Sequence, residues 1–430
     1  MQAPTTTPVR IGLLGYGTVG SAVDAMLGAH GDDITRVLGQ PVEVARALVR
    51  DVSKPHAGAR PGLLCDRFEE VRDSGVSAVC EVMGGVEPTL GYVLELLERG
   101  ISVVSANKQL LARHGEQLFA VAQRHGAQLR FEASVCAAIP VVKVLRESML
   151  AAGVSEVLGI VNGTTNFILS AMAGQGADYA ESLARAQELG YAEADPTDDV
   201  GGGDAAAKLA ILASIAFHSH VRIDDVPYEG IDRLEAIDVA LAGELGYAVK
   251  LIAQTRLSDE GVTAEVGPTL VPHGHSLAGV EGSFNAVVLR GEAIREVLLQ
   301  GPGAGGAETA SAVVGDLLGV LGTRGSGSFQ HDGYYRKIPI VPRERVVSPL
   351  YVRMLVSDRP GVLARIASAF GSHDVSIASM IQRPAGDGEA TIVLLTHPAQ
   401  RAAADAAVAE VGALELTRSA PRMLRVLERS

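Results

Sequence analysis

The sequence predicts an α/β protein with three parts: an N-terminal doubly wound domain, a central mixed α/β domain and a smaller C-terminal α/β domain. The first part alternates short apolar segments with helical patterns, which is typical of a parallel doubly wound sheet. The middle part has strand-like alternation, which indicates a largely antiparallel sheet. The last part follows the order βαββα with a final apolar segment, as in a ferredoxin-like split βαβ unit.

The N-terminal part, which we expect to span residues 1–135, begins with an apolar strand and a glycine-rich turn. Strands are predicted at residues 9–14, 42–49, 78–83 and 102–105, and helices at 21–27, 89–98 and 110–124. A second glycine-rich run opens another helix at residues 301–322, and we expect this segment to complete the domain.

The central domain is predicted to span residues 136–300 and the C-terminal domain residues 349–430, joined by a linker at 323–348 that is rich in Gly, Ser, Arg and Pro. In the central domain we expect strands at 154–161, 247–254, 262–266 and 285–289, and helices at 166–172, 179–189 and 205–217. In the C-terminal domain we expect strands at 351–356, 376–382, 389–396 and 423–427, and helices at 362–371 and 400–412.

The composition limits the possible classes of protein. With 430 residues, 47% of them hydrophobic, the chain is long enough for about three packed domains. Its net charge of −13 argues against a nucleic-acid partner, which requires a basic surface. The three cysteines lack a CxxC spacing, residues 1–8 lack the features of a secretory leader, and no apolar run reaches the about 20 residues of a membrane span. We therefore expect a cytoplasmic protein without a membrane partner.

The glycine-rich turn after the first strand has the spacing of a dinucleotide-binding loop. Gly15, Gly17 and Gly20 form a G-x-G-x-x-G pattern between a predicted strand and a predicted helix. The glycines allow a tight turn, and the helix start around Thr18 and Val19 would present backbone N–H groups and a helix dipole to a pyrophosphate. This context favours a Rossmann nucleotide-binding domain over an ordinary glycine-rich βα turn.

The end of the second strand bears on the choice of cofactor. NAD-binding domains commonly place an acidic residue there for the ribose 2′-hydroxyl, whereas this chain has Arg50 and then Lys54. Two cations suit the 2′-phosphate of NADP, although Asp51 lies next to Arg50. We therefore expect NADP as the preferred cofactor, with NAD as an alternative.

An acidic segment in the central domain is the strongest sign of a substrate site. Five carboxylates occur within twelve residues, among Gly and Pro residues that favour a loop, and Lys208 follows on a predicted helix four residues after Asp204. Such a loop suits a small cationic or zwitterionic substrate; a Ca²⁺ loop or a capped helix start is the alternative. The five acids are Glu193, Asp195, Asp198, Asp199 and Asp204.

Two lysines could stabilise the oxygen of a carbonyl group that accepts a hydride. Lys208 is expected to be protonated at neutral pH, because an unperturbed lysine has a pKa of about 10.4, and Asp204 would keep it charged and oriented. Lys108 follows a predicted strand end, at the edge where open α/β sheets bind ligands. An exposed structural lysine is the alternative at this position.

Taken together, these segments closely resemble the homoserine dehydrogenase family over about residues 1–345. The matching segments are GYGTVG (15–20), RDVSKP (50–55), EVMGG (81–85), SANK (105–108), FEASV (131–135), VNGTTNFIL (161–169), GYAEADPTDDV (190–200) and GPGAGGAETASAVVGDL (301–317). The segment DRPGVLARIASAF (358–370) is similar to an ACT domain, a module that binds small amino acids at paired interfaces.

The resemblance implies the NAD(P)H-dependent, reversible reduction of L-aspartate 4-semialdehyde to L-homoserine, in threonine and methionine biosynthesis. Lys208 would be the proton donor, and Lys108 a second catalytic lysine near the nicotinamide and the substrate. Glu193 would bind the substrate ammonium, and Asp204 would help to hold the substrate and Lys208. The resemblance also places Thr164, Tyr191 and Asp199 in the substrate pocket and Gly303 at the cofactor.

The family also has a sodium-type monovalent cation, held mostly by backbone carbonyls. The corresponding positions in this chain are Glu132, Val135, Ala137 and Ile139. Cys136-Ala137-Ala138 replaces a sequence that is commonly glycine-rich in the family, and a positive φ is costly for alanine.

The resemblance further implies a homodimer or homotetramer, with feedback regulation by an amino acid, expected to be threonine, through the ACT-like domain. Two other functions stay open. A reductase of a different semialdehyde or of a 2-oxo acid is one, although simple hydroxy acids lack the ammonium group that the acidic segment suits. A ligand sensor that has lost catalysis is the other, although the chain retains Lys108, Glu193, Asp204 and Lys208.

Overall fold

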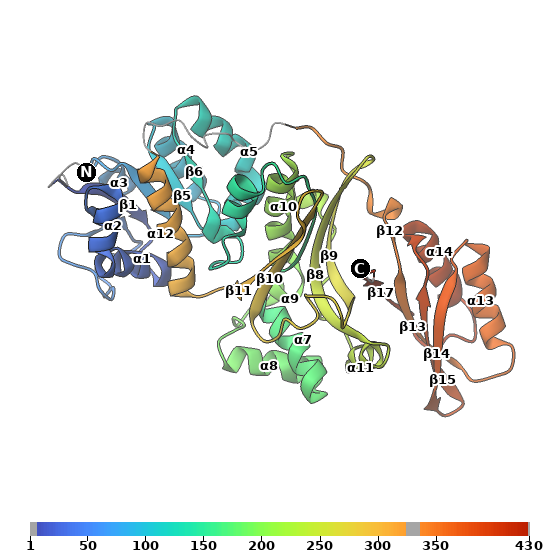
Figure 1. Cartoon of the computed structure of the whole chain (residues 1–430). Coiled ribbons are helices and arrows are strands. Elements are labelled where there is room, and N and C mark those ends of the chain that lie inside the picture. The colour runs from blue at the N-terminus through green and yellow to red at the C-terminus, as the bar shows by residue number, and fades with distance from the viewer. Residues whose placement is uncertain (1–6, 324–335, 429–430) are drawn as a thin grey trace. The chain divides into compact units, whose positions relative to one another are not determined.

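The computed structural model describes residues 7–323 and 336–428, and the chain forms two compact units, each described separately below (Figure 1). Unit 1 comprises Met1–Val157, Ala207–Asp225 and Asn285–Ile338, and unit 2 comprises Leu158–Ala206, Val226–Phe284 and Pro339–Ser430. Residues 1–6, residues 324–335 of the expected linker and residues 429–430 lie outside the described residues. Within the described ranges, no helix is long and apolar enough to cross a membrane.

Unit 1 contains a six-stranded parallel sheet in the order β3-β2-β1-β4-β5-β6. Its strands are β1 (Val9–Leu14), β2 (Val42–Leu48), β3 (Leu64–Cys65), β4 (Ala78–Glu81), β5 (Ser102–Ser105) and β6 (Leu129–Arg130). The strand order reverses beside β1, since β2 and β3 lie on one side of it and β4 to β6 on the other. This arrangement confirms the predicted doubly wound sheet and places a ligand-binding crevice at the carboxyl ends of β1 and β4.

The helices of this sheet include one that comes from much later in the chain. They are α1 (Thr18–Ala29), α2 (Gly31–Leu38), α3 (Phe68–Arg72), α4 (Thr89–Glu98), α5 (Lys108–Arg124) and α12 (Gly306–Gly322). Helix α12, orange in Figure 1, packs beside α1, which is blue. Val313 and Leu317 of α12 are buried in the same hydrophobic core as Ile11 and Leu13 of β1, so the second glycine-rich run belongs to this sheet.

Unit 1 also contains a hairpin and several short helical turns. The turns are η1 (Glu132–Ser134), α6 (Val141–Lys143), η2 (Val144–Ser148) and η3 (Ile223–Asp225), and the hairpin strands are β10 (Phe284–Gly291) and β11 (Arg295–Pro302). The sequence analysis does not predict β11, because this strand lies at the edge of its sheet and none of its residues is fully buried. Its apolar alternation is correspondingly weak.

Unit 2 is built on a long antiparallel hairpin of β8 (Tyr247–Ser258) and β9 (Gly261–Pro272). Helices α7 (Gly163–Gln175) and α11 (Ala236–Glu244) pack against β8, and α8 (Tyr179–Glu188) packs against α7. The acidic segment is largely loop, as expected, and it also forms one helical turn, α9 (Thr197–Val200). Strand β7 (Val154–Ile160) and helix α10 (Gly203–Phe217) run from one unit into the other along the chain.

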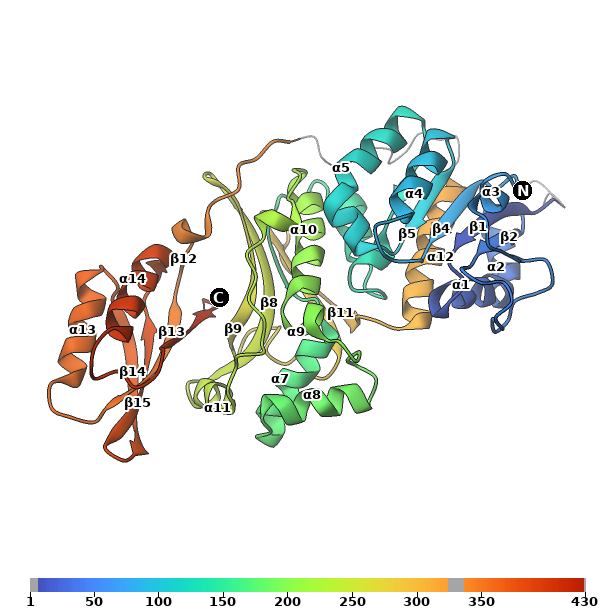
Figure 2. The ribbon, with the colours of Figure 1, turned by 180° about the vertical axis from the view of Figure 1, so that it is seen from behind.

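The C-terminal part of unit 2 has an antiparallel sheet in the order β17-β13-β15-β14. Its elements are β13 (Leu350–Ser357), α13 (Val362–Ser372), β14 (Ile377–Gly386), β15 (Glu389–Thr396), α14 (Arg401–Gly412) and β17 (Arg422–Val426), with a ribbon of β12 (Val347–Ser348) and β16 (Ala399–Gln400). Helices α13 and α14 lie side by side on one face of this sheet, and Phe370 and Ala407 are buried in its core (Figure 2). The ferredoxin-like prediction is thereby confirmed.

Strand β17 also joins this sheet to the long hairpin, because it pairs in parallel with β9. Two buried ion pairs accompany this junction. Arg425 Nη1 lies 2.8 Å from Glu265 Oε1, and Arg353 Nε lies 2.6 Å from Oδ1 of Asp238, which has no exposed surface. Because removing one partner of such a pair leaves a buried charge uncompensated, these residues tie the C-terminal part to the rest of unit 2.

Candidate active site

The first glycine-rich turn leads from β1 directly into α1. Gly15 has φ +105°, which residues with a side chain rarely adopt, and a Cβ there would lie 3.0 Å from Val82 O. Gly20, on the first turn of α1, has no room for a Cβ, because the carbonyl oxygen of Gly15 occupies that space. Gly17 is the N-cap and Thr18 begins the helix, so the backbone here fits a bound pyrophosphate.

The second glycine-rich run lies beside the same helix start. Gly306 begins α12, and a Cβ there would lie 2.8 Å from Thr18 Cγ2. Gly303 packs against the side chain of Asn285, which fills the space that a Cβ on Gly303 would need. A side chain at either position would displace Asn285 or Thr18, so glycine allows this close packing beside the nucleotide loop.

The acidic residue of the loop after β2 is hydrogen-bonded within that loop. Asp51 Oδ1 accepts hydrogen bonds from Ser53 N at 3.0 Å and Ser53 Oγ at 2.6 Å, and these bonds lower the pKa of the Asp51 carboxyl. Lys54 Nζ lies 4.0 Å from Asp51 Oδ2, and Arg50 is exposed. The Asp51 carboxylate thus stabilises the turn of its own loop, while Arg50, just after β2, is exposed.

Strands β4 and β5 end in a buried network that the sequence analysis missed. Glu81 has no exposed surface, and its carboxylate accepts hydrogen bonds from Ser105 Oγ at 2.6 Å, Met83 N at 2.9 Å and Gly84 N at 3.3 Å. Burial raises the pKa of Glu81, and these hydrogen bonds oppose the rise. The network fixes the loops that follow both strands, and its signal in the sequence is a carboxylate that ends an otherwise apolar strand.

Lys108 is the first residue of α5 and is half-buried. The residue before it, Asn107, caps the helix by accepting a hydrogen bond from Leu110 N at 3.1 Å. The Asn107 amide donates to Gly85 O at 2.6 Å, and its backbone N–H donates to Ser105 Oγ at 3.1 Å. These bonds hold Lys108 at the carboxyl end of β5.

In unit 2, three residues that are far apart in the sequence meet at the start of α7. Asn162 Nδ2 donates one hydrogen bond to Asp199 Oδ1 at 2.7 Å and another to Asp204 Oδ2 at 2.8 Å. Its Oδ1 accepts a hydrogen bond from Thr165 N at 2.9 Å and so caps α7. Asn162 is 4% exposed and Asp204 1% exposed, whereas Asp199 is half-buried, so this amide links a buried carboxylate to one nearer the surface. The sequence analysis does not single out Asn162.

Thr164 lies beside the same carboxylates. Its hydroxyl donates a hydrogen bond to Tyr191 O at 2.6 Å and lies 3.4 Å from Asp199 Oδ2. The ring of Tyr191 packs against the ring of Phe167, with 4.9 Å between the ring centroids. Tyr191 therefore contributes its backbone carbonyl to this cluster, while its side chain contacts Phe167 and stays exposed.

The other acids of the segment are exposed. Asp195 Oδ1 accepts hydrogen bonds from Thr197 N at 3.2 Å and Thr197 Oγ1 at 2.6 Å, which begin the turn of α9 and lower the pKa of Asp195. The backbone carbonyl of Glu193 accepts a hydrogen bond from Gln187 Nε2 at 3.1 Å, while its carboxylate lies at the surface, like that of Asp198. The acidic segment thus combines one buried acid, Asp204, and the half-buried Asp199 with three acids that face solvent.

Lys208 follows Asp204 by one turn of α10 and therefore lies on the same helix face. Lys208 is half-buried and Asp204 is buried. A carboxylate one turn before a lysine favours the charged ammonium. A group held on this face of α10 would meet both a negative charge and a proton donor.

The loop with the expected cation positions follows η1. Cys136 and Ala137 have φ values of +57° and +37°, a region that costs a residue with a Cβ roughly 1–2 kcal/mol. The Glu132 carboxylate accepts hydrogen bonds from Val142 N at 2.8 Å and Lys143 N at 2.7 Å, and burial raises its pKa to about 8. Both oxygens of this carboxylate thus accept hydrogen bonds from backbone N–H groups of the next helical segment, α6.

All four expected cation positions, Glu132, Val135, Ala137 and Ile139, are buried. The described part of the chain contains no group of three His, Cys, Asp or Glu side chains suited to a metal ion. Backbone carbonyls, rather than such side chains, are the expected ligands here.

Three family models match the chain. Residues 15–132 match the model described as homoserine dehydrogenase, NAD binding domain, and residues 140–318 match the model described as homoserine dehydrogenase. Residues 350–415 match the ACT domain. These matches fall on the nucleotide loop, the acidic cluster and the ferredoxin-like part, respectively.

Known proteins of the same name are similar along nearly the whole chain. The homoserine dehydrogenase of Corynebacterium glutamicum is 45% identical over 398 residues, covering 91% of this chain and 89% of the relative. That of Mycobacterium tuberculosis is 44% identical over 435 residues, covering 97% and 98%. A crystal structure from Thiobacillus denitrificans has a TM-score of 0.94 at 39% identity, covering 98% and 99%. A hyperthermophilic archaeal homoserine dehydrogenase in complex with NADPH has a TM-score of 0.61 at 26% identity, covering 73% and 98%.

Proposed function

We propose that this chain, which belongs to the homoserine dehydrogenase family, reversibly reduces L-aspartate 4-semialdehyde to L-homoserine and prefers NADP(H) as its cofactor. The observation that carries this proposal is the pair of buried Asp204 and half-buried Asp199, bridged by Asn162, with Lys208 one turn further along α10. Carboxylates suit the ammonium group of an amino-acid substrate, and a lysine suits the oxygen of its aldehyde.

Lys208 is the proposed proton donor in the direction of reduction. A bound nicotinamide supplies the hydride in this direction and accepts it in the other. When the aldehyde carbon gains a hydride, the carbonyl π electrons become a lone pair on oxygen, and the Lys208 ammonium transfers a proton to it. In the oxidation of homoserine, the neutral Lys208 amine takes the hydroxyl proton. Asp204 stabilises the charged form of Lys208 and orients it.

We assign substrate binding to the start of α7 and to the acidic segment. Glu193, whose carboxylate is exposed, is the proposed partner of the substrate ammonium, and buried Asp204 and half-buried Asp199 provide further negative charge. Thr164 and the backbone carbonyl of Tyr191 keep Asp199 in position. Together these groups would distinguish an amino-acid aldehyde from a simple oxo acid.

We assign cofactor binding to the two glycine-rich runs, because Gly306 at the start of α12 lies against Thr18 at the start of α1. Arg50 is the proposed partner of the NADP 2′-phosphate, with Lys54 as a second cation, while the carboxylate of Asp51 is engaged by hydrogen bonds from Ser53. The archaeal relative solved with NADPH supports this cofactor class. Lys108 is the proposed second catalytic lysine near the nicotinamide. The contacts assigned to the pyrophosphate side are Gly15, Gly17, Thr18, Val19, Gly20 and Gly303.

We further propose that the loop at residues 132–139 binds a monovalent cation through its backbone carbonyls. The support is the left-handed backbone at Cys136 and Ala137, because such strain in residues other than glycine persists where the surroundings or the function require it. Activity measured in sodium chloride should exceed activity in choline chloride of equal ionic strength. Equal activity in both salts would remove the cation from the account.

The ACT domain is the proposed site of regulation by an amino acid, with threonine as the effector. The ACT match at residues 350–415 supports this assignment, and a homodimer or homotetramer is the proposed assembly. Saturating threonine should lower the rate of homoserine oxidation, and light scattering should give the mass of two or four chains. Unchanged kinetics with threonine would exclude this effector.

The function is tested by following the absorbance of reduced nicotinamide with purified protein and L-homoserine, using NADP and NAD in parallel. We expect turnover with homoserine, a lower KM for NADP than for NAD, and little turnover with 4-hydroxybutyrate, which lacks the ammonium group. Turnover with 4-hydroxybutyrate at the same kcat/KM would contradict the proposed role of the acidic cluster. No turnover with either cofactor, in a folded protein that binds nucleotide, would favour the sensor.

A further inference from the structure

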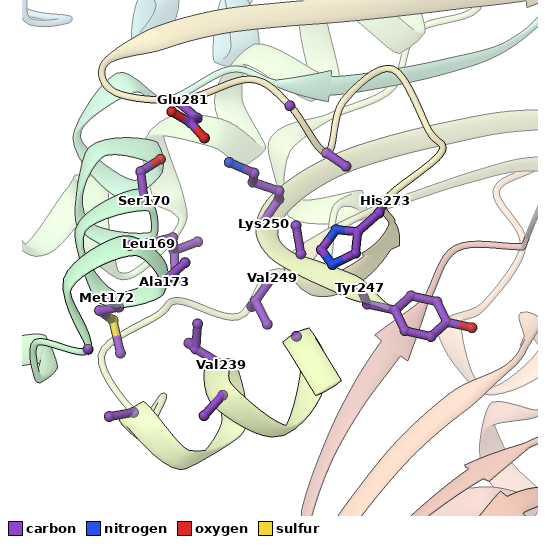
Figure 3. A pocket seen from close by; sticks show the side chains of 18 of the residues that line it. Leu169, Ser170, Met172, Ala173, Val239, Tyr247, Val249, Lys250, His273 and Glu281 are labelled. Atoms are coloured by element: carbon purple, nitrogen blue, oxygen red, sulfur yellow. The ribbon is translucent and has the colours of Figure 1, made fainter. Parts of the chain in front are cut away.

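Unit 2 contains a cavity of about 800 Å³ that none of the proposed functions uses. It lies between α7, α11, β8 and the loop that includes His273 and Glu281 (Figure 3). Its volume is within the range of about 300–1,000 Å³ that is usual for small-molecule sites. One end is apolar, with Leu169, Met172, Val239 and Val249, and the other end carries Lys250 and Glu281.

Lys250 is a buried lysine whose hydrogen-bond acceptors are uncharged groups. It is 4% exposed, and its Nζ donates hydrogen bonds to Asn166 Oδ1 at 3.1 Å and Val280 O at 2.6 Å. Among the described residues, no carboxylate forms an ion pair with it. Burial lowers the pKa of Lys250 to about 8, while the charge of Glu281 opposes this shift. A lysine that is buried in this way normally has a carboxylate partner, because an unpaired charge is costly to bury.

The charges and hydrogen-bonding groups that line the cavity indicate which class of ligand it can bind. An ammonium group has three N–H donors, and two of those on Lys250 are occupied by neutral acceptors, which leaves one for an anionic oxygen. Figure 3 shows the Lys250 ammonium near Glu281 and Ser170, with the apolar side chains deeper along the same wall. The exposed carboxylate of Glu281 can in turn pair with a cationic group.

We propose that this cavity binds an aliphatic α-amino acid. Its carboxylate accepts a hydrogen bond from Lys250, its ammonium group faces Glu281, and its side chain packs against the apolar end around Met172 and Val239. The site is separate from the ACT domain and from the acidic cluster, because every residue that lines it belongs to 169–176, 236–250 or 273–281. It therefore does not depend on the proposed catalytic function.

The sequence offers a direct reporter for this site. Lys250 is the only lysine in the stretches 158–206, 226–284 and 339–430 that make up unit 2. Acetylation of the full-length protein at pH 8, followed by peptide mass spectrometry, therefore reports on one amine within this unit. A bound carboxylate should slow its acetylation at least about fivefold, and Lys337, which is exposed in unit 1, serves as the internal control.

The decisive experiment combines this labelling with calorimetric titration of L-leucine, 4-methylpentanoate and 3-methylbutylamine. All three probes have the same branched chain. Leucine carries both a carboxylate and an ammonium group, 4-methylpentanoate carries only the carboxylate, and 3-methylbutylamine carries only the ammonium group. We expect leucine to bind and to protect Lys250, 4-methylpentanoate to bind about tenfold more weakly, and the amine not to bind. Glu281→Gln should weaken leucine to the level of 4-methylpentanoate, Lys250→Met should abolish binding of both, and Asp259→Asn, an exposed acid in the hairpin turn, should change neither.

The proposal fails if leucine at millimolar concentration gives no heat of binding and leaves the acetylation rate of Lys250 unchanged. It also fails if leucine binds equally well to the wild type, to Glu281→Gln and to Lys250→Met, since the site would then lie elsewhere. If Lys250 becomes reactive only on dilution of the protein, a second copy of the chain covers the cavity, and the small-molecule proposal is wrong. Should Lys250→Met not fold, Glu281→Gln and the labelling still decide between these outcomes.

Discussion

Replacing Asn162 by Ser or Asp separates the two roles of this side chain at the start of α7. Its Oδ1 caps the helix, and its Nδ2 donates one hydrogen bond to each of Asp199 and Asp204. Ser and Asp are both good N-caps, so either variant retains the cap and loses the bridge. The difference from wild type therefore reports on the bridge between the carboxylates.

The size of the effect follows from the two hydrogen bonds. A hydrogen bond to a charged group contributes about 1.5–3 kcal/mol, so the pair sums to about 3–6 kcal/mol. In Asn162→Ser, water can replace part of these hydrogen bonds. We expect the remaining loss of transition-state stabilisation to be about 2–3 kcal/mol, which lowers kcat/KM for homoserine about 30- to 150-fold.

The pH dependence distinguishes the two variants. In Asn162→Asp, a third carboxyl group lies beside Asp199 and Asp204, and like charges raise the pKa of such groups. As the pH falls from about 8 to about 5.5, the introduced carboxyl gains a proton and can again donate a hydrogen bond. The deficit of Asn162→Asp relative to wild type should therefore shrink at low pH, whereas that of Asn162→Ser should stay constant.

The assay is steady-state homoserine oxidation with NADP across this pH range, with circular dichroism melting curves as the control for folding. A value of kcat/KM for Asn162→Ser within threefold of wild type would refute the reasoning, because the bridge would then contribute nothing to the site. A constant ratio between Asn162→Asp and wild type at all pH values would refute the electrostatic part alone.

Three further predictions concern the cofactor, the C-terminal junction and the cavity. Replacing Arg50 by Ala should raise the KM for NADP about tenfold and leave the KM for NAD within twofold, because a phosphate contact of this kind contributes more than about 1 kcal/mol; equal effects on both cofactors would contradict the assignment. Replacing Arg353 by Leu leaves Asp238 buried without its partner and should lower the unfolding free energy of unit 2 by about 3–5 kcal/mol. The control is Arg345→Leu, which removes an exposed ion pair and should lower the unfolding free energy by less than about 1 kcal/mol in scanning calorimetry. Similar losses of unfolding free energy in both variants would contradict this prediction. The pKa of Lys250 is about 8 in the folded protein, against an ordinary value of 10.5. As the pH rises between these two values, the unfolding free energy of wild-type unit 2 should increase, because the unfolded chain still binds a proton that the folded chain has lost. The rise is at most about 3 kcal/mol and should be absent in Lys250→Met; parallel denaturation curves for the two proteins over this range would contradict it.

The fold was largely predictable, because its local patterns agree with its tertiary structure. The segment from β1 through the glycine turn to α1 can be recognised from residues 9–29 alone, since each choice of residue there matches the required backbone. Helix α7 is harder: Asn162 and Gly163 are typical of turns, so the pattern predicts a start at Asn166, whereas the structure begins the helix at Gly163. The turn residues are in fact its cap.

The candidate site could be predicted only in part, for a different reason. Motifs identify Asp204 and Lys208, because their spacing on one helix is visible in the sequence. The bridge by Asn162 and the buried Glu81 network depend on contacts between segments that are far apart in the chain, and a single sequence does not indicate which distant polar residues meet. Tyr191 shows the same limit, because its residue type does not reveal that its backbone carbonyl faces Thr164.

The most direct test of the central claim is the rate of hydride transfer in a single turnover with saturating NADP and L-homoserine, measured for wild type, Lys208→Ala, Lys208→Arg and Lys337→Ala. The account predicts that Lys208→Ala and Lys208→Arg are both slower by at least about 100-fold, because arginine keeps the charge and does not exchange the proton, while Lys337→Ala is unchanged. Hydride transfer in Lys208→Ala within threefold of the wild-type rate would contradict the assignment of Lys208 as the residue that accepts the hydroxyl proton in this direction and donates it in the reverse direction.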